Sequence, residues 1–168
     1  MPKQEFPFPM PNGWFCVTRV DDIQNGESKP FTFCEKEVVA FRTESGKVSV
    51  MDAYCGYSGI NLAISGKVDG ETINSPKHGI KWNIDGSCAE IGKDSGIPKE
   101  AMEVKTFSYP CQELNGFIWA WHHLLKEEPY FEIPAIDGFN GEESKWGKEH
   151  HYEYHINTVL QEIAENDV

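Results

Sequence analysis

The sequence has no long apolar run and comparatively few basic residues, and each absence excludes a class of protein. No stretch approaches the roughly 18–20 consecutive apolar residues of a membrane-spanning helix, and the opening MPKQEFPFP lacks the basic-then-apolar layout of a signal peptide. With 15 basic against 27 acidic residues, the formal charge is −12, which disfavours nucleic acid and anionic lipid as partners. We therefore expect a cytoplasmic protein that neither inserts into membranes nor binds nucleic acid.

Cysteine is too scattered for a disulfide framework. An odd number of cysteines without tight spacing, in a chain long enough to bury a core, fits a reducing compartment. The five positions are Cys16, Cys34, Cys55, Cys88 and Cys111. Hydrophobic residues make up 39% of the chain and aromatic residues 12%, which is enough apolar surface for a folded domain.

Short strands separated by turns are expected over most of the chain. Apolar residues alternate from Trp14 to Val20, polar breaks divide residues 30–54 into hairpins, and glycine-containing turns recur from residue 66 to 86. Residues 103–109 and 117–121 read as two strands joined through Asn115-Gly116. This pattern predicts an all-β sandwich or barrel.

Two groups of side chains within this pattern have more than one interpretation. Phe117, Trp119 and Trp121 alternate along one strand, and we expect this face to lie in the core and not to bind a ligand. The histidines outside the glycine-rich loops lack the spacing of a structural zinc site, and we expect them to be solvated. They are His122, His123, His150, His151 and His155.

The end of the chain changes character. Residues 124–147 are acidic and contain Pro129 and Pro134, which predicts an irregular surface segment. Residues 151–156 then alternate as a strand, and helix-forming residues follow a cap at Asn157 or Thr158. We expect a short C-terminal helix here.

Two glycine-rich loops carry the distinctive residues. The first reads Asp52-Ala53-Tyr54-Cys55-Gly56-Tyr57-Ser58-Gly59, and the second reads Ser75-Pro76-Lys77-His78-Gly79. They resemble the two loops of a Rieske domain, which read Cys-x-His-x-x-Gly and Cys-Pro-x-His-Gly-Trp. The resemblance implies an all-β, Rieske iron–sulfur-protein-like fold of stacked antiparallel sheets, with a cluster-binding subdomain at about residues 50–90.

Two of the four cluster ligands of that pattern are replaced. A Rieske [2Fe–2S] centre binds one iron with two thiolates and the other with two imidazoles. The resemblance places Cys55 at one thiolate position and His78 at one imidazole position, while Tyr57 replaces the second histidine and Ser75 the second cysteine. A phenol with a pKa near about 10 and an alcohol are far poorer iron ligands at neutral pH. We therefore expect no bound cofactor and no metal.

Two alternatives remain for these positions. A serine alkoxide is a hard donor for ferric iron, so a [2Fe–2S] cluster held by the altered set Cys55, Tyr57, Ser75 and His78 is the first. A single Zn²⁺ on Cys55 and His78 is the second, and it needs two further donors. Without a metal, we interpret Cys55 as a small buried hydrophobe and His78 as a histidine bonded to backbone carbonyls.

The flanking sequence is similar to the N-terminal half of Rieske oxygenases that act on sterols, the 3-ketosteroid 9α-hydroxylases and cholesterol 7-desaturases. The matching segments are Phe6–Pro9, Asn12–Phe15, Asp52–Cys55, Ile97-Pro98, Asn115–Ile118 and Gln161–Asn166. In that family the last segment opens a catalytic domain that binds a mononuclear iron further downstream. The resemblance implies a Rieske-like domain over residues 1–150 and, over residues 151–168, a strand and short helix that begin a missing catalytic domain.

The resemblance leaves three interpretations of function. The first is a cluster-free, non-catalytic binding or accessory module whose partner is an oxygenase catalytic subunit or a second copy of the chain. The second is an electron-transfer component of a sterol oxygenase that keeps a [2Fe–2S] cluster on the altered ligands. The third is a fragment or decayed remnant. In none of them does the chain act as an enzyme alone.

Overall fold

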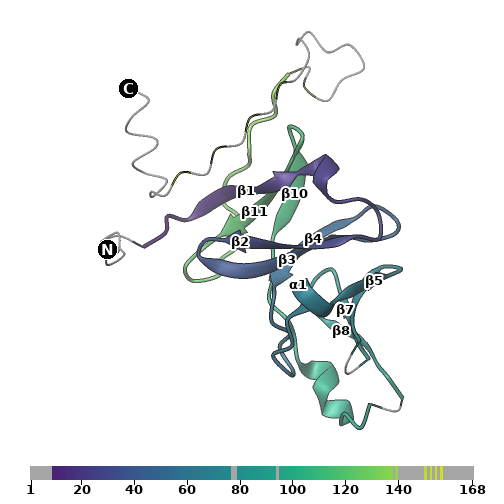
Figure 1. Ribbon diagram of the computed structural model, residues 1–168. Helices are drawn as coiled ribbons and strands as arrows, with labels where there is room; N and C mark the ends of the chain where they lie inside the picture. The colour runs from purple at the N-terminus through teal and green to yellow at the C-terminus, as the bar shows by residue number, and fades with distance from the viewer. Residues whose placement is uncertain are drawn as a thin grey trace.

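The computed structural model describes residues 9–76, 79–93 and 95–137, together with residues 139, 150, 152, 154 and 156. Within these residues, eleven strands form three antiparallel sheets, accompanied by one four-residue α-helix and two 3₁₀ helices. Figure 1 shows the β1–β11–β10 sheet above the sheet of β2, β3 and β4, with the β5–β8 sheet below them. The prediction of stacked antiparallel sheets is confirmed.

The elements occur in the following places. The upper sheet has the order β1 (Gly13–Arg19), β11 (Phe117–His122) and β10 (Cys111–Leu114). The middle sheet has the order β2 (Ser28–Phe33), β3 (Lys36–Arg42), β4 (Val48–Asp52) and β9 (Ser108–Tyr109). The lower sheet has the order β5 (Lys67–Asp69), β6 (Thr72–Ser75), β7 (Ile80–Asn83) and β8 (Cys88–Ile91). The helices are η1 (Val20–Asp22), α1 (Leu62–Ser65) and η2 (Lys99–Glu103).

Strand β3 is buried on both of its faces, because the middle sheet separates two cores. Val38 and Ala40 pack into the core that lies against the upper sheet, whereas Val39 and Phe41 pack into the core that lies against the lower sheet. All four side chains have no exposed surface. A strand covered on both faces gives a continuous apolar run in place of alternation, and Figure 1 shows β3 lying between the upper and lower sheets.

One predicted strand pairing is wrong. Residues 103–109 were expected to pair with residues 117–121, but the partner of β11 in the Asn115-Gly116 hairpin is β10. Both turn residues have positive φ, 52° at Asn115 and 78° at Gly116, as a two-residue hairpin turn requires. The predicted strand at 103–109 is reduced to the end of η2 and the two residues of β9.

The core-facing side of β11 is also the opposite of the one predicted. Ile118 and Ala120 are fully buried in the upper core, while Phe117 and Trp119 are half-buried. Trp121 is buried on the other side of the sheet, where it contacts the rings of Tyr130 and Phe131 in the irregular segment that follows β11. Since that segment covers part of the second face, an aromatic stripe is stabilised there without facing the main core.

The C-terminal predictions are tested only in part. Residues 123–137 contain no helix or strand, as predicted for an irregular surface segment. The predicted strand is described only at Tyr152, Tyr154 and Ile156, which are exposed and carry no strand assignment. The predicted helix after Asn157 lies outside the described residues. In the described part of the chain, no helix has the length and apolar character needed to cross a membrane.

Candidate functional site

The first glycine-rich loop leaves β4 at Asp52 and closes on itself within ten residues. A bridge joins Tyr54 to Asn61, and the Cys55 N–H donates to the Ile60 carbonyl at 2.9 Å. The Gly59 N–H returns to the Cys55 carbonyl at 2.9 Å, with φ +65° at Gly59. Two bonds to one backbone unit fix the position of Cys55 at the base of the loop.

A buried tyrosine anchors the entry to this loop. The Tyr109 hydroxyl donates to Asp52 Oδ1 at 2.8 Å. Burial, reinforced by this hydrogen bond and by the negative charge of Asp52, raises the pKa of Tyr109 far above its usual range. The phenol therefore stays protonated and keeps donating to Asp52 at every physiological pH.

The sulfur of Cys55 is buried and contacts Ser58. Sγ lies 3.0 Å from Ser58 Oγ, and the Ser58 N–H donates to it at 3.4 Å. The prediction that Cys55 is a small buried side chain is confirmed, and these two contacts could not be inferred from the sequence.

The second loop follows β6 and begins at Ser75. The Gly79 N–H donates to the Ser75 carbonyl at 2.8 Å, and Gly79 has φ +60°. The Ser75 side chain is 0% exposed, and its Oγ has no hydrogen-bond partner among the described residues. Lys77 and the predicted site residue His78 lie outside the described residues.

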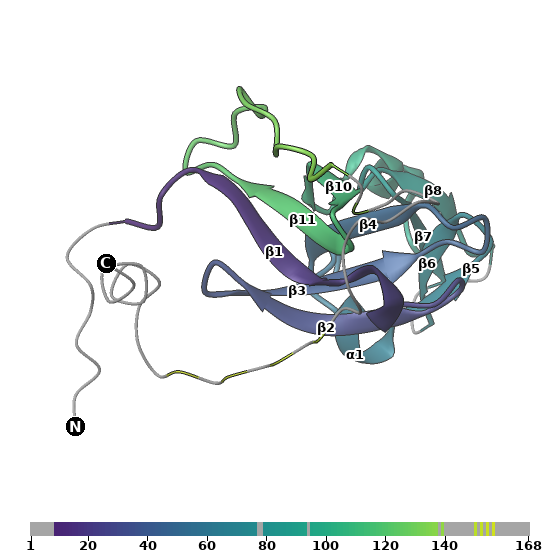
Figure 2. The ribbon, with the colours of Figure 1, turned by 90° about the horizontal axis from the view of Figure 1, so that it is seen from above.

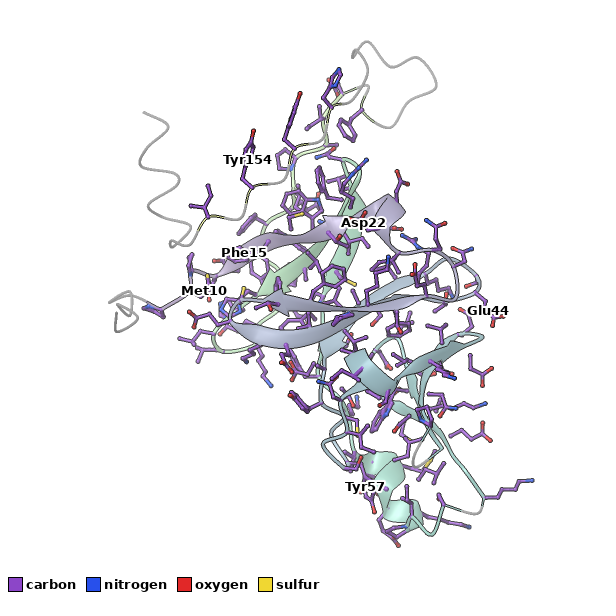
Figure 3. All side chains as sticks on the ribbon, viewed as in Figure 1. Met10, Phe15, Asp22, Glu44, Tyr57 and Tyr154 are labelled. Carbon is purple, nitrogen blue, oxygen red and sulfur yellow. The ribbon has the colours of Figure 1, made fainter. Side chains whose placement is uncertain are left out.

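Both loops belong to the lower core. Ser75 stands opposite Ile80 in the β6–β7 ladder, and Ile80 and Cys55 are members of the same buried cluster. Tyr57 lies on the first loop (Figure 3), with 38% of its surface exposed. Its hydroxyl has no hydrogen-bond partner in the described part of the chain. The structure therefore buries the Cys55 and Ser75 positions and leaves Tyr57 facing solvent.

Lys105 and Thr106, which the sequence did not single out, pack against the first loop and against the β7–β8 turn. The Gly56 N–H donates to Thr106 Oγ1 at 3.1 Å, and a Cβ added at Gly56 would lie 2.2 Å from the Lys105 carbonyl oxygen. At Gly86 an added Cβ would lie 1.8 Å from the Thr106 carbonyl oxygen. Only glycine allows another backbone segment to approach so closely. Gly56 and Gly86 were therefore the residues in the sequence that could have indicated this contact.

The histidines of the upper sheet are not solvated, which corrects the prediction for two of them. His122 is half-buried at the end of β11, and burial lowers its pKa. His123 stacks on Trp121, and its Nδ1 accepts the N–H groups of Leu125 and Glu127, each at 3.3 Å. These contacts fix the turn after β11. His150 is exposed, whereas His151 and His155 lie outside the described residues.

The part of the chain that the structure describes contains no cluster of metal donors. There, no three or more histidine, cysteine, aspartate or glutamate side chains gather as a metal site would require. The candidate site therefore consists of the two loops and the Lys105-Thr106 segment that contacts the first of them.

Comparison with known proteins agrees with this architecture. Residues 13–108 match the Rieske [2Fe-2S] domain. The chain is 36% identical to a cholesterol 7-desaturase of Ciona intestinalis, over 96% of this chain and 33% of that protein. It is 33% identical to the oxygenase component of a 3-ketosteroid-9-alpha-monooxygenase of Rhodococcus rhodochrous, over 80% of this chain and 35% of that protein.

A solved structure shares the fold at lower identity. The terminal oxygenase of carbazole 1,9a-dioxygenase from Nocardioides aromaticivorans IC177 superposes with a TM-score of 0.64 at 20% identity, over 78% of this chain and 35% of that chain. The present chain thus spans about a third of the length of these relatives. The profile match covers more than half of the chain, and the chain belongs to the Rieske [2Fe-2S] domain family.

Proposed function

We propose that this chain is a cluster-free Rieske domain that acts as a non-catalytic binding or accessory module for a Rieske-type oxygenase of sterols or steroids. The observation that carries the proposal is the donor set of the two loops. Of the three described ligand positions, only Cys55 offers a sulfur, while Tyr57 offers a phenol and Ser75 an alcohol.

This donor set does not fit a Rieske [2Fe–2S] cluster. With His78 in place, each iron would keep one ordinary protein ligand, and the other would be a neutral oxygen at pH 7. Tyr57 is 38% exposed, and its hydroxyl has no hydrogen-bond partner among the described residues. We therefore derive no electron-transfer step through this site.

The class of partner follows from the relatives. The matched proteins are named as a cholesterol 7-desaturase and as the oxygenase component of a steroid monooxygenase, and this chain spans about a third of each. A domain that keeps the family fold but lacks the ligand set can still contact whatever its relatives' Rieske domains contact. We propose that it associates with an oxygenase catalytic unit. In this proposal the two loops form part of the contact surface and hold no redox centre.

The test is the colour of the purified protein, together with its mass in solution beside a sterol-type oxygenase. A colourless, folded chain that co-elutes with the oxygenase in size-exclusion chromatography supports the proposal. A brown chain would contradict the cluster-free part. A colourless chain that stays monomeric in the mixture would contradict the accessory part.

One observation favours a second candidate function. The Oγ of Ser75 is fully buried and has no hydrogen-bond partner among the described residues, and a buried polar atom that lacks a hydrogen bond is the kind of group that a missing ligand would satisfy. This atom would suit a [2Fe–2S] electron-transfer component with altered ligands. That candidate requires a brown protein whose colour is lost in Ser75→Ala.

A further inference from the structure

A groove outside the two loops runs between strand β2 and helix α1. Its volume is about 260 Å³, and Figure 2 shows α1 lying beside β2. Pro30 and Thr32 of β2 line one side, and Ala63 and Ile64 of α1 line the other. Glu37 of β3 lies at one end and supplies the only charge among the described residues that line the groove.

The apolar wall of the groove is held in place by a helix cap. The Asn61 side chain accepts the N–H groups of Ala63 and Ile64 at 2.9 and 3.2 Å, which fixes the first turn of α1. Leu62 points into the lower core with no exposed surface, so the opposite side of this short helix must face outward. Ile64 is 83% exposed as a result, and it projects from a rigid position.

The carboxylate at the end of the groove is also held in place. Glu37 Oε2 accepts the Tyr54 hydroxyl at 2.6 Å and the Asn61 side-chain amide at 3.2 Å. The hydrogen bond to Glu37 raises the pKa of Tyr54, so this hydroxyl keeps its proton and continues to donate. No described residue donates to the other oxygen, Oε1. The groove therefore ends in one positioned oxygen that is available to a ligand.

The apolar wall and the carboxylate of the groove together favour a ligand that has a positive charge at the end of an aliphatic chain. A guanidinium prefers two carboxylate oxygens at once, whereas an ammonium group is a compact point charge that one oxygen suits. Four methylene groups can cover Ala63, Ile64 and Pro30 while the charged end remains hydrated. The net charge of −12 further favours a basic partner surface.

We propose that this groove receives a lysine side chain of a protein partner, with the stem along α1 and the ammonium on Glu37 Oε1. The inference deepens the proposed function and rests on its binding role, because it names one contact through which the accessory module would dock. It does not depend on whether the two loops hold a cluster.

The test is an NMR titration of the whole chain with the peptide acetyl-Ala-Lys-Ala-amide. Saturable shifts are expected at the Ile64 methyl groups and the Asn61 side-chain amide. The same peptide with norleucine in place of lysine keeps the stem but lacks the charge, and it should bind about fivefold more weakly, as should the lysine peptide to Glu37→Gln. Glu35→Gln removes an exposed carboxylate from the neighbouring turn and should leave the affinity unchanged.

Three results would overturn the groove assignment: shifts spread over the acidic surface, equal affinity for the two peptides, or an unchanged affinity in Glu37→Gln. The backbone spectrum of Glu37→Gln verifies that the exposed substitution leaves the fold intact. A negative titration with a colourless protein rejects the groove alone. A brown protein rejects the cluster-free function whatever the titration shows.

Discussion

Removal of the Ser75 hydroxyl should stabilise the protein. A buried hydroxyl without a hydrogen bond costs about 1–3 kcal/mol, and Ser75 Oγ has no partner among the residues that the structure describes. Ser75→Ala removes the cost while it gives up a few tenths of a kcal/mol of strand preference. We expect the free energy of unfolding to rise by about 1 kcal/mol, which raises Tm by about 2–4 °C in a chain of this length.

Ser49 provides a matched control, since it is also a buried serine on a strand. Its Oγ donates to the Ile84 carbonyl at 2.7 Å, and Ser108 Oγ donates to the same oxygen at 2.8 Å. Ser49→Ala therefore loses one hydrogen bond without leaving an unpaired carbonyl, and should lower the free energy of unfolding by about 1 kcal/mol. The two substitutions should thus act with opposite sign.

Urea unfolding followed by the fluorescence of the five tryptophans measures both variants, and unchanged m values would show that the unfolded states are comparable. A loss of about 1 kcal/mol or more in Ser75→Ala, with Ser49→Ala behaving as expected, would refute the reasoning. It would mean that Ser75 Oγ has a partner, and the altered-ligand cluster would become the leading explanation.

Three other predictions concern the scaffold. Arg42→Met should lower the free energy of unfolding by about 3–5 kcal/mol. This arginine is 7% exposed, and it donates to three backbone carbonyls and to Glu113 at 2.5 Å. A loss of less than about 1 kcal/mol, measured by urea unfolding, would contradict this prediction. Gly86→Ala should lower Tm far more than Gly59→Ala. Both glycines have positive φ, but only at Gly86 would an added Cβ meet a backbone oxygen, that of Thr106. Equal Tm values would argue against this close contact. Burial lowers the pKa of His122 in the folded state, so the unfolded chain binds the proton first and the free energy of unfolding falls as pH drops below about 6.5. His122→Asn should flatten this pH dependence, measured by urea unfolding between about pH 7.5 and 5.5. An unchanged slope would contradict the prediction.

Local signals in the sequence were sufficient to predict most strands and turns. Residues 14–20, 30–54 and 66–84 formed the expected strands because alternation and glycine turns are short-range properties. Strand β3 illustrates the limit of that pattern. Its run of Val38 to Phe41 does not alternate, and burial on both faces depends on two other layers that are distant in sequence.

The errors have one local and one long-range cause. The partner of β11 was misassigned because residues 103–109 and 111–114 both look extended, and the tight turn at Asn115-Gly116 pairs β11 with the nearer segment. The aromatic face of the same strand was misjudged because a segment without periodicity covers it. The site could be located by its loops, but neither the Ser58 contacts to Cys55 nor the orphan hydroxyl of Ser75 is visible in a linear pattern.

The central claim is tested most directly by iron and acid-labile sulfide, measured on one sample of the chain expressed anaerobically with ample iron. The double variant Tyr57→His, Ser75→Cys, prepared in parallel, restores the full Rieske ligand set and serves as the positive control. The account predicts a double variant with about two irons and two sulfides per chain, and a natural chain with neither. About two irons and two sulfides in the natural chain would contradict it and would make Tyr57 and Ser75 candidate cluster ligands.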